Sequence, residues 1–171
     1  MNEFYYPIAL KIKGKSALVI GGGKIAERKI TTLLKFRVRI RVVAPDLTPV
    51  LKKHFESGSI VWRRRVVKPQ DIKNADIIVA ATSDPVVNKK VSRWAKKENI
   101  LVNVVDEPEL SSFISPAILS ASRAIVAVYT HGRDPVLSRD LKNFLKENWN
   151  GFLSYRSRLQ KRIIRETGRS L

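Results

Sequence analysis

Five strand candidates alternate with helical patterns over the first 105 residues, and this alternation limits the fold more than any other feature of the chain. Short unbroken apolar runs are typical of strands that are buried on both faces. Strands that alternate with helices specify a parallel sheet with right-handed crossovers and helices on both faces. The sequence therefore predicts an α/β fold, with strands at residues 16–20, 38–44, 59–67, 76–81 and 100–105.

The helices between these strands are predicted from apolar residues that recur at helical spacing. The expected helices lie at residues 24–34, 47–57 and 86–95, with one helical turn within residues 68–74. In the first of them, the side chains expected to face solvent are Lys24, Glu27, Arg28 and Lys29.

Three arginines alternate where the second strand begins, at Arg37, Arg39 and Arg41. A row of guanidinium groups is unfavourable inside a sheet that is covered on both faces. We therefore expect this part of the strand to lie near an edge, to snorkel past apolar neighbours or to face a wet groove.

A different pattern begins after residue 106. Residues 107–118 are polar and punctuated by proline, and residues 124–130 read as one more strand. The tail, residues 152–168, is amphipathic, with a single apolar stripe between basic faces. The second half of the chain therefore does not continue the alternation of strands and helices.

Residues 21–26, with the sequence GGGKIA, fit the G-x-G-x-x-A fingerprint between a predicted strand and a predicted helix. Gly21 permits the tight turn, Gly23 lets the backbone approach a pyrophosphate, and Ala26 lets helix and strand pack closely. Backbone N–H groups and the helix dipole then face the phosphates. The motif predicts a Rossmann-like dinucleotide site, and a glycine turn without a ligand is the alternative.

The choice of cofactor depends on the end of the second strand. Asp46 follows the glycines by about 20 residues, where an acid accepts hydrogen bonds from the adenosine ribose of NAD. Arg41 or a nearby arginine could instead hold the 2′-phosphate of NADP. We favour NAD, and a simple turn or cap residue is the other interpretation of Asp46.

Polar residues also end the fourth and fifth predicted strands, where Thr82 and Asp106 follow. Ligands of open α/β sheets bind beyond the carboxyl ends of the strands. Thr82 is therefore placed to touch the dinucleotide. The alternative is that this segment only provides a cap for the next helix, at Ser83 or Asp84. Asp106 has two interpretations: it could act as a general base beside a nicotinamide, or it could be an acid in a surface turn. The expected cofactor-binding residues are Gly21, Gly22, Gly23, Lys24, Ile25, Pro45, Asp46 and Thr82.

A helix start is predicted at Asp134, an N-cap residue type, with Pro135 at the first helical position. The segment before it contains Thr130, His131, Gly132 and Arg133. A helix N-terminus with an arginine and a histidine nearby can bind carboxylates. The alternative is a solvated loop.

Composition narrows the function classes further. Lysine and arginine number 33 against 15 acidic residues, so the net charge is +18 and the partners are expected to be anionic. The absence of cysteine excludes disulfides, thiolate catalysis and cysteine zinc sites, and two histidines argue against a metal centre. No apolar run reaches the roughly 20 residues of a membrane span, and the N-terminus lacks a secretion signal. We expect a cytoplasmic protein.

Seven blocks of sequence, in order along the chain, resemble precorrin-2 dehydrogenases, which also form the N-terminal module of bifunctional siroheme synthases. The resemblance spans residues 6–145. The blocks are residues 6–8 (YPI), 21–29 (GGGKIAERK), 42–49 (VVAPDLTP), 80–88 (AATSDPVVN), 103–106 (NVVD), 112–117 (SFISPA) and 126–137.

The resemblance implies oxidation of precorrin-2 to sirohydrochlorin with NAD⁺ as the hydride acceptor, and it gives Asp106 the catalytic role. It also implies intertwined homodimers, formed through the region that follows the dinucleotide domain. The tetrapyrrole substrate is rimmed with carboxylates, which suits a basic cleft. The expected substrate-binding residues are Arg28, Thr130, His131, Gly132 and Arg133. Lys24 is a further candidate for binding the substrate carboxylates.

On this basis residues 1–112 are expected to form the NAD-binding Rossmann domain. Residues 113–148 would form a dimerisation and substrate region, and residues 149–171 a short helical tail. The family usually has glycine at the position of Arg37, Gly-Gly at His131-Gly132 and serine at Asp134. We therefore expect a different helix end and a different substrate loop.

Two alternatives to a simple dehydrogenase stay open. Some family members also insert iron or cobalt into sirohydrochlorin, so a bifunctional enzyme with ferrochelatase activity is one of them. A non-catalytic dinucleotide-sensing module is the other. Nucleic-acid binding would depend only on charge runs such as residues 63–65, which are more often solvated faces, so it is disfavoured.

Overall fold

The structure is a computed structural model that describes residues 5–121, 124–130 and 134–167. The chain divides into two units, Met1–Ile114 and Ser115–Leu171. None of the helices that the described residues form has the length and the apolar character needed to cross a membrane.

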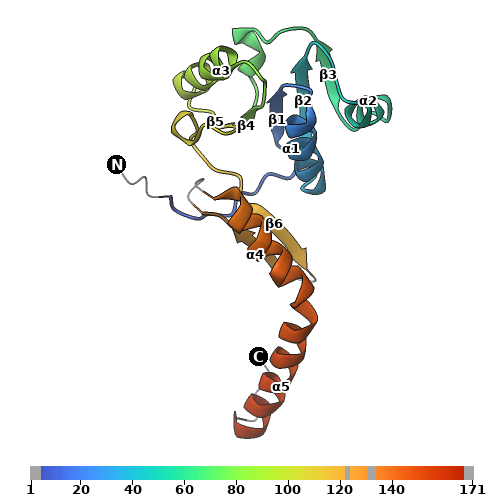
Figure 1. The fold of residues 1–171 in the computed structure, drawn as a ribbon, viewed down its shortest axis with the longest axis vertical. Coiled ribbons are helices and arrows are strands. Elements are labelled where there is room, and N and C mark those ends of the chain that lie inside the picture. The colour runs from blue at the N-terminus through green and yellow to red at the C-terminus, as the bar shows by residue number, and fades with distance from the viewer. Residues whose placement is uncertain (1–4, 122–123, 131–133, 168–171) are drawn as a thin grey trace. The chain divides into compact units, whose positions relative to one another are not determined.

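A five-stranded parallel sheet forms the first unit (Figure 1). Its strands stand in the order β3-β2-β1-β4-β5, and every neighbouring pair is parallel. This confirms the predicted Rossmann-like α/β fold. The strand order reverses between β1 and β4, which is where ligands bind in such sheets. The strands are β1 (Ser16–Ile20), β2 (Arg39–Ala44), β3 (Val61–Arg64), β4 (Ile77–Ala80) and β5 (Leu101–Val104).

Helices cover both faces of the sheet because β1 is apolar at every second position on each side. Ala17 and Val19 belong to a cluster with residues of α1 (Lys24–Lys35) and α2 (Pro49–Glu56). Leu18 and Ile20 belong to the opposite cluster, with residues of the 3-10 turn η1 (Pro69–Ile72) and α3 (Pro85–Lys97). Burial on both faces explains why this strand is an unbroken apolar run.

Arg39 and Arg41 of the arginine row belong to a strand in the interior of the sheet, because β2 stands between β1 and β3. The expectation of an edge was therefore wrong. Arg39 and Arg41 line an open cavity of about 540 Å³ at the amino ends of the strands, which agrees with the wet groove. The Nη2 atom of Arg41 donates a hydrogen bond to the carbonyl of Lys73 at 2.9 Å. The guanidinium groups thus avoid the core by reaching its margin.

Arg37 stands outside the strand and occupies the turn after α1. Its φ of +56° lies in the left-handed region that glycine prefers. The N–H of Arg37 donates to the carbonyl of Leu34, and the N–H of Gly14 donates to the carbonyl of Arg37, both at 3.0 Å. The helix therefore ends in a left-handed residue even though arginine replaces the family's usual glycine.

Asp71 is a fully buried acid that binds two arginines across the loop between β3 and β4. Its carboxylate accepts hydrogen bonds from Arg63 at 2.9 Å, from Arg65 at 2.6 and 2.7 Å, and from the N–H of Lys68 at 2.8 Å. The hydrogen bonds from Arg65 contribute most to lowering the pKa of Asp71 from 3.8 to about 2, although burial opposes them. Two residues of the basic run at 63–65, Arg63 and Arg65, therefore have a structural role.

We predict that Asp71→Asn lowers the free energy of unfolding by roughly 2 to 3 kcal/mol at pH 7, because the stabilisation that comes from the lowered pKa of the Asp71 carboxyl is lost. A lowered folded-state pKa stabilises the protein above the unfolded pKa of about 3.9, and that contribution is lost as the pH falls through about 2. Urea unfolding between pH 2 and pH 7 measures both effects. Asp140→Asn removes an exposed pair with Arg139 and should change little. If Asp71→Asn lost as much stability as the wild type between pH 7 and pH 2, Asp71 would not be the source of this pH dependence.

The second unit combines an antiparallel pair of strands with two helices. The elements are β6 (Ala117–Ala121), β7 (Ala124–Val128), α4 (Pro135–Glu147) and α5 (Trp149–Thr167). The predicted strand at 124–130 is confirmed as β7. The predicted helix start is also confirmed, since Oδ1 of Asp134 accepts a hydrogen bond from the N–H of Leu137 at 2.7 Å.

The expectation of a polar connection at residues 107–118 was wrong at its end, where β6 begins. Residues 108–110 form a 3-10 turn, η2 (Pro108–Leu110). The run AILSA of β6 is short and contains small residues, so it has no strong strand pattern of its own. Its strand conformation depends on pairing with β7.

Candidate functional site

The turn after β1 is built on glycines that a larger residue could not replace. Gly21 has a φ of +117°, and an added Cβ would lie 2.3 Å from the carbonyl oxygen of Ala81. At Gly22 an added Cβ would lie 1.9 Å from the carbonyl oxygen of Asp46. Both glycines therefore let the turn pack against the chain that follows the two neighbouring strands.

Gly23 differs from its two neighbours because an added Cβ would meet nothing within 4 Å. It is the N-cap residue of α1, and no side chain makes a capping hydrogen bond there. The side chain of Ile25 is 40% exposed, and that of Lys24 extends into solvent. An uncapped helix start behind open space fits a pyrophosphate, because first-turn N–H groups and the helix dipole favour an anion. The residues at this turn are thus suited to hold a dinucleotide.

Pro45 and Asp46 follow β2 at the same rim of the sheet, and both are exposed. Oδ1 of Asp46 accepts a hydrogen bond from the N–H of Leu47 at 2.8 Å and lies 3.1 Å from Nζ of Lys52. The Leu47 N–H and then Lys52 hold the pKa of the Asp46 carboxyl below its usual range. Asp46 is therefore an ionised turn residue that stays open to solvent, a position compatible with a ribose contact. The guanidinium of Arg41 reaches the other rim, which disfavours it as a binder of a 2′-phosphate.

Thr82 follows β4 and organises the loop before α3. Its hydroxyl donates to Oδ1 of Asn88 at 2.8 Å, and Nδ2 of the buried Asn88 donates to the Thr82 carbonyl at 3.0 Å. Oδ1 of Asp84 accepts from the N–H of Val86 at 2.8 Å, so Asp84 also caps the helix as expected. Asn88 was not among the predicted site residues, since its contact with Thr82 spans a turn that no local pattern reveals.

Asp106 stands just beyond β5, in a left-handed conformation with a φ of +61°. The N–H of Val105 still donates to the carbonyl of Ala80 at 2.9 Å, so the pairing with β4 extends up to the turn. The Asp106 side chain is exposed. Because β1, β4 and β5 are consecutive parallel strands, the glycine turn, Thr82 and Asp106 all lie at their carboxyl ends.

The expectation that all four polar residues of the first helix face solvent was wrong for Glu27 and Lys29, which are both half-buried. Burial lowers the pKa of the Lys29 amine, and the charge of Arg28 lowers it further, whereas the charge of Asp106 raises it. Lys29 was not among the predicted site residues. Helical periodicity places it at the margin of the apolar face, where the sequence pattern alone does not decide whether a side chain is buried.

The expected substrate-binding residues are spread over different parts of the chain. Arg28 is exposed on α1. Thr130 belongs to the second unit, where its hydroxyl lies 3.0 Å from that of Ser138. His131, Gly132 and Arg133 lie outside the described residues.

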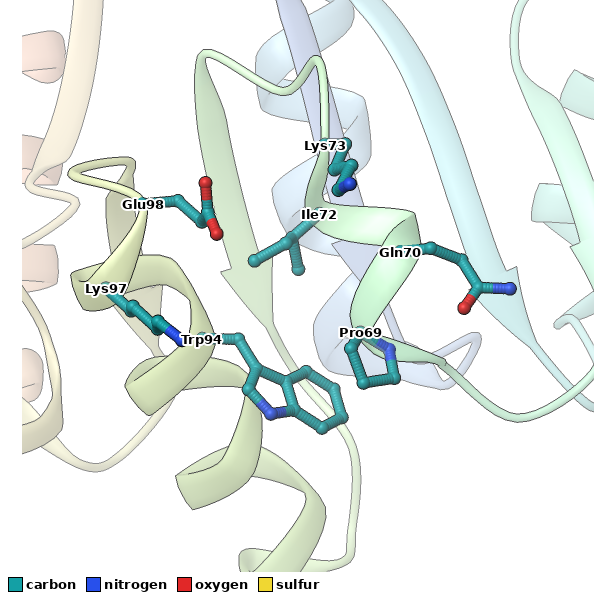
Figure 2. Close-up of a pocket in the computed structure, with 7 residues that line it drawn as sticks. All are labelled: Pro69, Gln70, Ile72, Lys73, Trp94, Lys97 and Glu98. Atoms are coloured by element: carbon teal, nitrogen blue, oxygen red, sulfur yellow. The ribbon is translucent and has the colours of Figure 1, made fainter.

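A separate cavity of about 440 Å³ lies between η1 and the end of α3 (Figure 2). Its lining includes Trp94, Pro69 and Ile72, with Lys73, Lys97 and Glu98 around them. These residues precede β4 and β5, so the cavity lies at the amino ends of the strands. The predicted site residues that the structure places in the first unit are at the opposite ends.

We predict that Gly23→Asp folds normally but binds NAD⁺ at least tenfold more weakly, because the new carboxylate would repel the pyrophosphate in the open space before α1. Isothermal titration calorimetry with NAD⁺ measures the affinity. Gly23→Asn adds a side chain of the same shape without the charge, so comparing the two variants separates charge repulsion from the steric effect of the side chain. Unchanged NAD⁺ affinity in Gly23→Asp would contradict the location of the site.

Comparison with known proteins gives a family match and close relatives. A family model described as "Putative NAD(P)-binding" matches residues 8–117. The siroheme synthase of Methylobacillus flagellatus is 44% identical over 136 residues, which cover 80% of this chain and 29% of that protein. The siroheme synthase of Nitrosomonas europaea is 42% identical over 143 residues, covering 83% of this chain and 30% of that protein.

A solved structure described as SirC, precorrin-2 dehydrogenase, superposes with a TM-score of 0.73 at 34% sequence identity. The match covers 84% of this chain and 71% of that chain. By contrast, the chain spans only about 30% of the length of the siroheme synthases that it matches.

Proposed function

Because this chain belongs to the family of precorrin-2 dehydrogenases and siroheme synthase N-terminal modules, we propose that it oxidises precorrin-2 to sirohydrochlorin. The observation that carries the proposal is the arrangement at one rim of the sheet. An open, uncapped helix start at Gly23 and the carboxylate of Asp106 follow strands that are separated only by β4. This arrangement suits an anionic dinucleotide and a substrate that must lose a proton beside it.

When it is bound, NAD⁺ would accept the hydride. The first unit would hold it through the turn at Gly21–Gly23, with Ile25 and the segment Pro45–Asp46 beside the adenosine half. Thr82 would act mainly by shaping its loop through Asn88. The protein thereby contributes position and charge more than covalent chemistry.

Oxidation of the macrocycle removes a hydride and a proton, and we assign the proton to Asp106. An exposed carboxylate at the end of β5 can accept a proton from the substrate and release it to solvent. The backbone of Asp106 has a defined position at the end of β5, because the backbone pairing with β4 continues up to Val105. Asp106 is thus the proposed catalytic residue.

The substrate would be held by cations, since its acetate and propionate groups are anionic. Arg28 and Lys24 are exposed on the first turns of α1 and can form charge-assisted hydrogen bonds with carboxylates. We keep Thr130, His131, Gly132 and Arg133 as the proposed contribution of the segment between β7 and α4. Residues 1–112 would thus bind the dinucleotide, residues 113–148 would serve dimerisation and substrate binding, and residues 149–171 would form the tail.

We also propose a homodimer formed through the second unit. Leu137, Leu141 and Phe144 recur at helical spacing on α4 and are 53%, 43% and 59% exposed. Phe152 and Tyr155 continue the apolar surface on α5 at 49% and 57% exposed. Apolar surface of this kind on two successive helices is typical of an interface.

We predict that Leu141→Asp converts the dimer to a monomer, because a desolvated carboxylate would replace an apolar contact. Sedimentation velocity measures the molecular mass in solution. Lys142→Asp, a charge reversal at the next residue of the same helix, is the control and should stay dimeric. A wild-type protein that sediments as a monomer would refute the dimer.

The function is tested with purified protein, NAD⁺ and enzymatically made precorrin-2. The expected result is a rise in sirohydrochlorin absorbance that depends on NAD⁺, with NADP⁺ in a parallel reaction to settle the cofactor. A third reaction adds Fe²⁺ or Co²⁺ and follows the metallated product, which tests for a chelatase. No sirohydrochlorin with either dinucleotide would overturn the proposal and favour a dinucleotide-sensing module.

A further inference from the structure

Strand β5 is an edge of the parallel sheet, so every second N–H group along it points away from β4 (Figure 1). The N–H groups of Val102 and Val104 point outward, since that of Val105 points inward and donates to β4. Oγ of Ser112 accepts a hydrogen bond from the N–H of Val102 at 2.8 Å. Oγ of Ser111 accepts one from the N–H of Val104, also at 2.8 Å. Two serine hydroxyls therefore take the place of a further strand at this edge.

The Ser111 hydroxyl also contacts the turn that presents Asp106. Its single proton can be donated to the carbonyl of Glu107 at 3.1 Å or to that of Val104 at 3.2 Å. Val104 is the last residue of β5, and Glu107 directly follows Asp106. One side chain therefore bridges both ends of the turn at residues 104–107.

Ser111 is held in place by the contacts of its two neighbours in the chain. The hydroxyl of Ser92, a buried residue of α3, donates to the carbonyl of Leu110 at 2.5 Å. The N–H of Ser112 donates to the carbonyl of Val102 at 2.7 Å. The backbone at Ser111 is thus fixed to α3 on one side and to β5 on the other.

The turn at Asp106 needs a support of this kind. The φ of Asp106 is +61°, in the left-handed region where a residue with a side chain has a steric cost. Within the turn, the N–H of Glu107 donates to the carbonyl of Val104 at 3.3 Å, which is long for a hydrogen bond. The backbone of the turn therefore closes it only weakly, and the Ser111 hydroxyl adds shorter bonds at both ends.

We propose that Ser111 is a positioning residue for Asp106. Its hydroxyl ties the two ends of the turn together, and this fixes the direction in which the Asp106 carboxylate leaves the backbone. Small displacements of a reacting group cost large factors in rate, so the loss of this hydroxyl acts on turnover. The proposal rests on the function proposed above, because it requires Asp106 to act on the substrate.

Kinetics with precorrin-2 and NAD⁺ provide the first test. Ser111→Ala should lower kcat by about ten- to a hundredfold, while KM and the affinity for NAD⁺ stay within about twofold, since only the reacting group is misplaced. Ser111→Thr keeps the hydroxyl and should recover most of the rate. The backbone of Ser111 is extended, with a φ of −88° and a ψ of 149°, which suits a β-branched residue.

Ser112→Ala is the matched control, because it removes the same group from the next residue. The Ser112 hydroxyl accepts from the N–H of Val102, which lies further from the turn, so kcat should stay within about twofold of wild type. Equal loss of rate in the two alanine variants would overturn the proposal, because a general loosening of β5 would then be the cause. Thermal unfolding of each variant shows whether the fold is retained.

Two further kinetic outcomes would overturn the proposal. One is a raised KM with unchanged kcat in Ser111→Ala, because Ser111 would then act on substrate binding. The other is a rate in Ser111→Thr no higher than in Ser111→Ala, because the hydroxyl would then not be the relevant group.

The second test uses the protein without cofactor or substrate, so it is independent of the reaction. Hydrogen exchange followed by NMR measures the protection of single N–H groups. Ser111→Ala should accelerate exchange at Val104 and Glu107 by about tenfold or more, because the turn opens more often. Ser112→Ala should accelerate exchange at Val102 and leave the turn unchanged.

The exchange data separate this proposal from the proposed function. Unchanged exchange at Val104 and Glu107 in Ser111→Ala would refute the role of Ser111, whether or not the protein oxidises precorrin-2. Accelerated exchange in a protein whose wild type forms no sirohydrochlorin would support the contact and refute the proposed function, and with it the effect on turnover.

Discussion

Replacing Asp106 with asparagine is expected to lower the turnover of precorrin-2 about a hundredfold or more, with NAD⁺ affinity unchanged. Removal of a positioned general base costs about 10² to 10⁴ in rate. The dinucleotide turn follows β1 and does not include this residue, so binding of NAD⁺ should persist. Steady-state kinetics and calorimetry on the same preparation measure the two quantities.

Asparagine is the appropriate substitution because Asp106 has a φ of +61°. Asparagine tolerates the left-handed region, whereas alanine there would add backbone strain and confuse loss of chemistry with loss of structure. Asp84→Asn, at a helix cap in the same unit, serves as a control for the loss of an acid elsewhere. Turnover of Asp106→Asn within a few fold of wild type would show that the proton leaves by another route.

The second large effect is expected for the stability of the glycine turn. Gly22→Ala should lower the free energy of unfolding by about 3 kcal/mol or more, because an alanine Cβ cannot share space with backbone atoms. The clash would be with the carbonyl oxygen of Asp46 at 1.9 Å and with Cδ2 of Leu47 at 2.9 Å. The carbonyl of Gly22 also accepts a hydrogen bond from the N–H of Thr48, so the turn has little room to shift. Urea unfolding of the cofactor-free protein measures the change.

Gly23→Ala is the matched control, one residue further along. Its Cβ would meet nothing within 4 Å, and its backbone is extended, so the expected loss is about 1 kcal/mol or less. If both variants lost the same stability, the distinction between a packed glycine and an open one would be wrong. This comparison separates glycines that the fold requires from the one whose open space suits a ligand.

Much of the fold was predictable because its signals are local. The alternation of five strands with helices, the turn at Gly21 and the caps at Asp84 and Asp134 each depend on residues close together in the chain. Strand boundaries were predicted less accurately: the third strand was predicted at residues 59–67, but it extends only over Val61–Arg64. β6 was missed because its pairing partner, and not its own pattern, makes it a strand.

The sequence by itself determined the α/β class, the strand-to-helix glycine turn and the position of polar residues after the strands, since period and spacing encode them. Only the tertiary structure decided which of the polar residues meet. The partial burial of Lys29, the contacts of Asp71 with two arginines and the bonds of Asn88 to Thr82 all depend on packing between separate elements or across a loop. The charge and exposure of a side chain are set by what lies opposite to it, and a linear pattern contains no record of that neighbour.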